Sequence, residues 1–117
     1  MQINWQGVAI YLATKPIDMR KEINGLSLLV ADALQQSPQS LSVYVFYNRQ
    51  KDKVKCLWWD KNGFVLYYKR LERGRYKIPS VSDEVLILSH EQLSWLLAGL
   101  DFHLMAQFPE LNFTDYF

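Results

Sequence analysis

The sequence predicts an α+β domain with a mainly antiparallel sheet of about five strands and two helices. Short runs of β-branched and aromatic residues, separated by turn-forming residues, indicate the strands. Two other segments repeat their apolar residues every three or four positions, as one buried helix face requires. The predicted strands are 8–13, 41–47, 53–59, 64–71 and 84–88, and the predicted helices are 18–34 and 90–99.

Capping residues mark both helices. Asp18 is expected to be the N-cap of the first helix, because its carboxylate can accept from backbone N–H groups that lack an intrahelical partner. Ser89, with Gln92 three residues later, predicts a capping box at the start of the second helix. Gly99 is expected to end that helix.

The dipeptide Asn62-Gly63 predicts a hairpin between the third and fourth strands, because a type I′ turn needs two residues that accept positive φ. With these two residues as the loop, Lys55 falls opposite Arg70. Like charges placed opposite each other are destabilising. If the folded protein keeps such a pair, an anionic partner that binds both side chains is indicated. Alternatively, Glu72 or Asp60 could neutralise part of their charge.

Positive charge is concentrated in one part of the chain. The stretch 49–77 has ten basic and three acidic residues, a formal charge of +7, and the rest has three basic and nine acidic residues, or −6. This asymmetry indicates a surface that faces a polyanion. The alternative is a solvated sheet face whose lysines and arginines protect an edge strand. Gly74 predicts a turn that presents Arg73 and Arg75 to solvent.

Aromatic residues on the same segment have two interpretations. They could stack unpaired bases of a single-stranded nucleic acid. They could instead pack in the core and across strands, which is the interpretation favoured for Trp58 and Trp59. The residues in question are Trp58, Trp59, Tyr67, Tyr68 and Tyr76.

The sequence does not favour an enzyme. Its twelve acidic residues stand mostly singly, His90 and His103 have no cysteine partners, and no glycine-rich phosphate loop occurs. We therefore expect no catalytic residue, no metal and no cofactor. Cys56, as the single cysteine, predicts a core residue and suits a reducing compartment. With no signal peptide and no long apolar run, we expect a cytoplasmic protein without a membrane span.

The 117 residues fit one domain. We expect residues 1–102 to form this domain and residues 103–117 to form an apolar C-terminal tail. The tail could pack on the domain or mediate dimers, and the sequence favours neither.

Three segments, 17–30, 55–79 and 88–102, give the chain a family resemblance. In this order and spacing they resemble the TnpB accessory proteins, encoded by the second open reading frame of the IS-sixty-six class of bacterial insertion sequences. Glu22 departs from the family pattern, which usually has glycine there. The matched positions are Asp18, Met19, Arg20, Lys21, Gly25, Leu26, Lys55, Trp59, Asp60, Gly63, Lys69, Arg70, Leu71, Glu72, Arg73, Gly74 and Arg75.

The resemblance implies a non-catalytic accessory role in transposition, with DNA and the separately encoded transposase as expected partners. Lysine and arginine give affinity for phosphates, so we expect DNA contacts from the basic hairpin and the turn after it. The alternative is a protein–protein adaptor that docks the transposase without touching DNA. The expected DNA-binding residues are Lys55, Lys69, Arg70, Arg73, Arg75, Arg20 and Lys21, and the expected structural residues are Asp18, Trp59, Asp60, Gly63 and Gly74.

Overall fold

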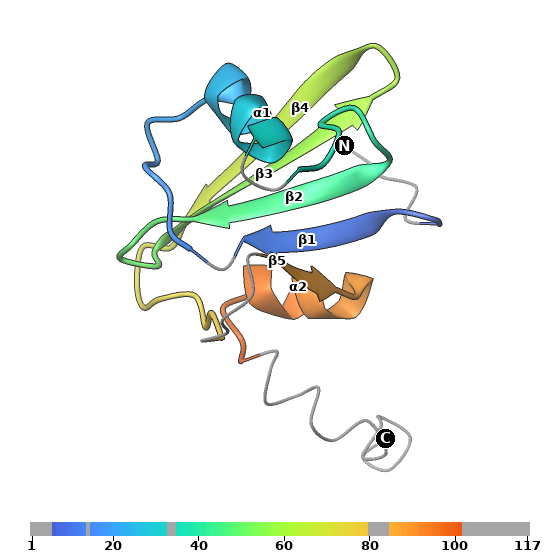
Figure 1. The fold of residues 1–117 in the computed structure, drawn as a ribbon. Coiled ribbons are helices and arrows are strands. Elements are labelled where there is room, and N and C mark those ends of the chain that lie inside the picture. Colours follow the sequence, from blue (N-terminus) through green and yellow to red (C-terminus); the bar gives the residue numbers. More distant parts are fainter. Residues whose placement is uncertain (1–5, 14, 33–34, 80–84, 102–117) are drawn as a thin grey trace.

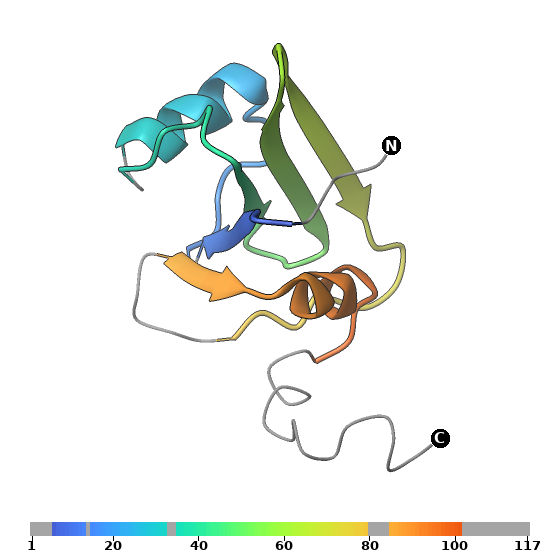
Figure 2. The same cartoon turned by 90° about the vertical axis from the view of Figure 1, so that its right-hand side faces the viewer.

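Five strands form one sheet with the order β4-β3-β2-β1-β5, and a helix covers each of its faces (Figure 1, Figure 2). The computed structural model describes residues 6–13, 15–32, 35–79 and 85–101. The predicted α+β class with a mostly antiparallel sheet is confirmed. The elements are β1 (Ala9–Ala13), α1 (Ile23–Asp32), β2 (Ser42–Tyr47), β3 (Lys53–Asp60), β4 (Gly63–Arg70), β5 (Val85–Leu88) and α2 (His90–Leu97).

The connections explain the directions of the strands. β1 and β2 are parallel, because the chain between them crosses one face of the sheet as α1. The remaining neighbours pair antiparallel. All six residues of β2 are buried, since this central strand has a covered face on both sides.

Alternate residues of the strands point to opposite faces of the sheet and form two hydrophobic cores. On one face, Leu26 and Val30 of α1 pack with Tyr44, Phe46 and Leu57. On the other face, α2 and the segment after β4 cover a second set. Its buried members are Ile10, Leu12, Val43, Val45, Tyr47, Val54, Cys56, Trp58, Tyr76, Leu88, Leu93 and Leu96.

The predicted caps of α2 are confirmed. The Gln92 amide donates to Ser89 Oγ at 3.1 Å, and the Ser89 amide donates to Gln92 Oε1 at 2.8 Å, which completes the capping box. After the helix, Gly99 has φ +81°, and its amide donates to the Leu96 carbonyl. The amide of Leu100 donates to the Trp95 carbonyl, so the end is a Schellman motif that needs a residue with positive φ.

The first helix begins at Ile23, so the prediction that Asp18 is its N-cap is wrong. Asp18 instead forms a turn with Arg20, whose backbone amide donates to Asp18 Oδ1 at 2.9 Å and whose guanidinium donates to both carboxylate oxygens. The hydrogen bonds from Arg20 lower the pKa of Asp18 to about 2. The expected extension of the helix to residue 34 lies outside the described residues.

A buried lysine explains why α1 begins late. Lys55 is only 4% exposed, and its ammonium donates to the carbonyls of Met19 and Lys21, each at 2.8 Å, and to Glu22 Oε1 at 3.1 Å. In a helix that began at residue 18, those two carbonyls would accept from amides four residues ahead. Lys55 donates to these carbonyls in place of the helical amides. The first hydrogen bond of the helical pattern is therefore from the Leu26 amide to the Glu22 carbonyl, at 2.9 Å.

The hairpin turn lies one residue earlier than predicted. Asp60 pairs with Gly63, so the loop residues are Lys61 and Asn62, and Lys61 takes the positive φ of +55°. The Asn62 amide donates to the Asp60 carbonyl, which makes a tighter turn than the predicted type I′. This shift changes the register, so the expected pair of Lys55 with Arg70 is wrong. Lys53 lies opposite Arg70, and Lys55 lies opposite Tyr68.

No helix in the described ranges has the length and apolar content to cross a bilayer.

Replacing Lys55 by methionine tests its structural role. Lys55→Met should lower the free energy of unfolding by about 2–4 kcal/mol, because two loop carbonyls lose their donor. Urea denaturation measures the change. Lys53→Met is the matched control, since Lys53 is partly exposed and pairs with one acid, Asp52, and it should cost less than about 1 kcal/mol. Equal losses in the two variants would contradict the role assigned to Lys55.

Alkaline pH should destabilise the protein. Burial raises the pKa of the Cys56 thiol and of the Tyr76 hydroxyl to about 12 each. In the unfolded chain these groups titrate near about 8.5 and about 10. The unfolded chain therefore loses protons first, and the free energy of unfolding should fall as pH rises from about 8.5 toward 12, by up to about 1.4 kcal/mol per pH unit for each group.

Urea titrations at pH values from 7 to 11 measure this slope. In Cys56→Ala the slope between about pH 9 and 10 should largely disappear, while the fall above about pH 10 remains because Tyr76 is unchanged. A stability that stays constant across the alkaline range would overturn the assignment.

Candidate nucleic-acid interface

The turn between β2 and β3, residues 48–52, is organised by one buried side chain. Asn48 is 5% exposed, and its Oδ1 accepts from the amides of Asp52 at 3.1 Å and Lys53 at 3.0 Å. Its Nδ2 donates to Asp52 Oδ1 at 2.6 Å. These bonds fix the backbone of the turn, so the side chain of Arg49 is exposed at a defined place.

The segment after β4 docks on this turn through backbone hydrogen bonds. The Leu71 amide donates to the Asp52 carbonyl at 2.8 Å, and the Tyr76 amide donates to the Lys51 carbonyl at 2.7 Å. Tyr76 is 1% exposed, and its hydroxyl donates to the Lys69 carbonyl at 3.3 Å. The ring of Tyr76 thus anchors a segment whose other side chains can remain in solvent.

Gly74 allows the reversal within this segment, because its φ is +77°. Arg73 and Arg75, on either side of it, are both exposed, as the sequence predicts. Lys77 is exposed as well. Arg75, Lys77 and Lys51 also line a small pocket of about 400 Å³.

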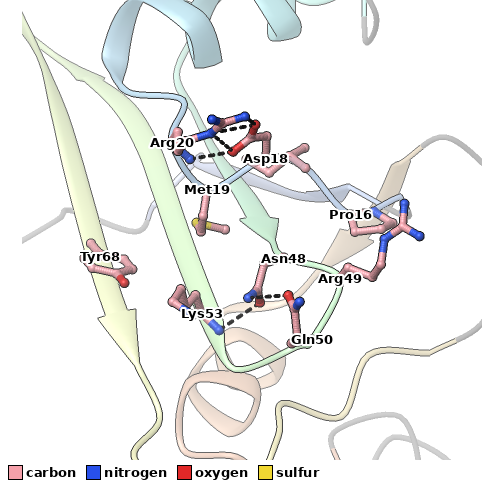
Figure 3. A pocket seen from close by; sticks show the side chains of 10 residues that line it. Pro16, Asp18, Met19, Arg20, Asn48, Arg49, Gln50, Lys53 and Tyr68 are labelled. Atoms are coloured by element: carbon pink, nitrogen blue, oxygen red, sulfur yellow. Dashed lines mark hydrogen bonds and ion pairs between the residues drawn. The ribbon is translucent and has the colours of Figure 1, made fainter.

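A larger pocket, of about 670 Å³, lies on the other side of the turn (Figure 3). It is bounded by the loop before α1, the turn after β2 and the neighbouring ends of β3 and β4. The Ile17 amide donates to the Tyr47 carbonyl at 2.9 Å and holds the loop against the sheet. The lining residues that can meet a ligand by charge or by an aromatic face include Arg20, Arg49, Lys53 and Tyr68.

These elements bring eight basic residues to one end of the molecule, which we call the basic end. The tip of the β3–β4 hairpin, with Lys61, lies at the opposite end of the two strands (Figure 1). Four acidic residues, Asp18, Asp52, Glu72 and Asp101, lie among the basic ones. The basic residues are Arg20, Arg49, Lys51, Lys53, Arg70, Arg73, Arg75 and Lys77.

Three of the eight are paired with acids. Arg20 pairs with Asp18, Lys53 with Asp52 at 3.3 Å, and Arg70 with Glu72 at 2.8 Å. The hydrogen bond to Glu72 raises the pKa of the Arg70 guanidinium, and hydrogen bonding from Asn48 lowers the pKa of Asp52. Exposed pairs of this kind are weak and exchange readily with other ions.

The other five have no ion pair with an acid in the described parts of the chain: Arg49, Lys51, Arg73, Arg75 and Lys77. A group of unpaired cations repels itself, so an anionic partner would relieve the repulsion.

Two of the expected DNA-binding lysines have structural partners instead. The ammonium of Lys55 is buried under the loop before α1, and its three hydrogen bonds use its three N–H donors. The Lys69 ammonium donates to the Leu97 carbonyl at 2.7 Å, at the C-terminus of α2. A cation at this end also interacts favourably with the negative end of the helix dipole. Lys21 is exposed, but its side chain packs beside Gly25 of α1 and does not line the larger pocket.

The expected structural residues of the hairpin lie at its tip, away from the basic end. Trp59 and Phe64 contact edge to face with ring centroids 5.0 Å apart. Asp60 and Gly63 close the turn as opposed residues. These residues therefore lie at the hairpin tip and do not border the two pockets.

The aromatic residues of this stretch were expected either to pack in the core or to stack bases, and the structure places them differently. Trp58 and Tyr76 are buried in the core, and Tyr67 packs against it. Tyr68 is 51% exposed and lines the larger pocket. Sequence reasoning gave no site role to Arg49, Lys51, Lys53 or Lys77, although the charge of the 49–77 stretch includes them.

Among the described residues, no group of three or more His, Cys, Asp or Glu side chains is placed to hold a metal ion.

The chain matches known sequences over most of its length. The family described as IS66 Orf2 like protein matches residues 8–107. Two similar proteins come from Sinorhizobium fredii (strain NBRC 101917 / NGR234): "Uncharacterized protein y4jC", 38% identical over 104 residues and 89% of each chain, and "Uncharacterized protein y4hO", 38% identical over 96 residues, 82% of this chain and 84% of the relative. No solved structure matches it significantly. The match extends into the expected tail, and it supports an accessory role in an insertion sequence. The chain belongs to the IS66 Orf2 like protein family.

Proposed function

We propose that this protein is a non-catalytic DNA-binding accessory factor in transposition, and that the basic end is its contact surface. The observation that carries the proposal is the unpaired positive charge of Arg49, Lys51, Arg73, Arg75 and Lys77 at one end of a nearly neutral chain. Phosphate contacts by such side chains release counterions and give affinity that does not depend on base sequence.

Placement on a rigid frame supports the same proposal. Backbone hydrogen bonds tie the 71–77 segment to the β2–β3 turn, so the cations of both segments keep a fixed spacing. Ordering long side chains at binding costs conformational entropy, and a fixed backbone reduces that cost. Arginine adds bidentate contacts to phosphate, which lysine cannot make. Arg73 and Arg75 are therefore the first residues to test.

The salt dependence of DNA binding tests the proposal. Fluorescence anisotropy of labelled element-end DNA, titrated across a salt series, should give a log–log slope of about −0.9 for each phosphate contact. Arg73→Gln/Arg75→Gln should weaken binding and make the slope shallower by about 2. Both side chains are exposed and form no ion pair with an acid in the described parts of the chain, so the variant should keep the thermal midpoint of the wild type.

Lys61→Gln is the control, because it removes an exposed charge at the far end of the hairpin. It should leave the slope within experimental error of wild type. Wild-type protein with no measurable DNA affinity, or equal effects of the two changes per charge removed, would refute the basic end as a DNA contact.

The second candidate is an adaptor that docks the transposase. Ile87, 68% exposed on the edge strand β5, favours a protein contact on another part of the surface. Retention of the transposase on the immobilised protein, lost in Ile87→Ser and kept in Arg73→Gln/Arg75→Gln without DNA, would support this role.

A further inference from the structure

Tyr68 is the most exposed aromatic side chain among the described residues, at 51%. It lies on β4 and faces the same side of the sheet as α1. Leu66 and Phe64, two and four residues earlier on the strand, face the same side and are partly buried there. Helix α1 does not cover it, because Lys55 holds the loop before the helix in a non-helical form and the helix begins only at Ile23. An aromatic face is thus left open at one end of a covered sheet.

The ring of Tyr68 is supported from the sheet by a fixed cation. Lys55 is its cross-strand partner, and the ammonium lies 5.5 Å from the ring centroid. The three hydrogen bonds of that ammonium immobilise it. A ring held in this way is a preorganised platform for a flat group, because little side-chain freedom is left to lose on binding.

Cations surround this platform. Lys53 and Arg70 are opposite each other on β3 and β4, on the same face as Tyr68. Arg49 lies across the pocket, on the β2–β3 turn (Figure 3). The acid in the lining, Asp18, is bound through both oxygens by Arg20, so these two largely neutralise each other. The arrangement is an aromatic face flanked by three cationic side chains. Two of them, Lys53 and Arg70, are paired with Asp52 and Glu72, and weak pairs of this kind can exchange their acid for a phosphate.

We propose, as an extension of the DNA-binding role proposed above, that the pocket beside Tyr68 holds an unpaired nucleotide of single-stranded DNA. The base stacks on the Tyr68 ring, and Arg49, Lys53 and Arg70 contact the phosphates on either side. A pocket of about 670 Å³ is within the size range of small-ligand sites. Bases of an intact duplex hide their faces against their neighbours, so only an unpaired base can use the ring. The protein should therefore prefer single strands, such as DNA opened at an element end.

The test compares two DNAs and three proteins. Labelled oligothymidine of about 12 nucleotides and a duplex of equal length are titrated with wild type, Tyr68→Leu and Tyr68→Phe. The wild type should bind the single strand more tightly than the duplex. Tyr68→Leu should weaken single-strand binding by roughly 5- to 150-fold, the usual effect of losing one stacked base, and leave duplex binding unchanged. Tyr68→Phe, which keeps the ring, should retain the preference.

The outcomes separate this inference from the proposed function. If Tyr68→Leu changes neither DNA while Arg73→Gln/Arg75→Gln weakens both, the pocket is not a nucleotide site, and the basic end still binds DNA. If Tyr68→Leu weakens both DNAs equally, Tyr68 has only a structural role, and the inference is overturned. If the wild type binds neither DNA, the inference and the proposed function fail together.

Discussion

The turn between β2 and β3 is the constraint on which the basic end depends. Its backbone is fixed by hydrogen bonds to the buried Asn48 side chain. The Lys51 carbonyl accepts a hydrogen bond from the Tyr76 amide, and the Asp52 carbonyl accepts one from the Leu71 amide. Two segments about twenty residues apart in the sequence are therefore joined by backbone bonds rather than by their charges. The charged side chains remain available on the surface because the backbone, and not ion pairing, holds the segments together.

Lys55 adds a second constraint on the opposite side of the same turn. A buried ammonium is tolerated only when its donors are satisfied, and the loop before α1 supplies two carbonyls and a carboxylate. Glu22, where the family usually has glycine, is that carboxylate. The same contact delays the start of the helix and leaves Tyr68 exposed, so a structural residue beside the Tyr68 ring determines which surface is open.

Patterns read from neighbouring residues predicted much of the fold. Runs of β-branched and aromatic residues identified the strands, and the Ser89–Gln92 pair identified the start of α2, because both signals depend on local backbone geometry. Asp18 and Asn62-Gly63 were misread because distant or competing contacts decided the outcome: Lys55, 34 to 36 residues away, caps the loop, and the turn closes around Lys61. The charge of the 49–77 stretch indicated a basic surface, but composition could not separate buried Lys55 and helix-capping Lys69 from exposed Arg49 and Arg73.

Hydrogen–deuterium exchange of the full chain, alone and with element-end DNA carrying a single-stranded extension, tests the central claim most directly. If the basic end is the contact surface, DNA should slow exchange in residues 16–20, 48–53 and 68–77 and leave the hairpin tip around Lys61 unchanged. Protection confined to the hairpin tip, β5 or α2, or no protection at DNA concentrations that saturate binding, would contradict it.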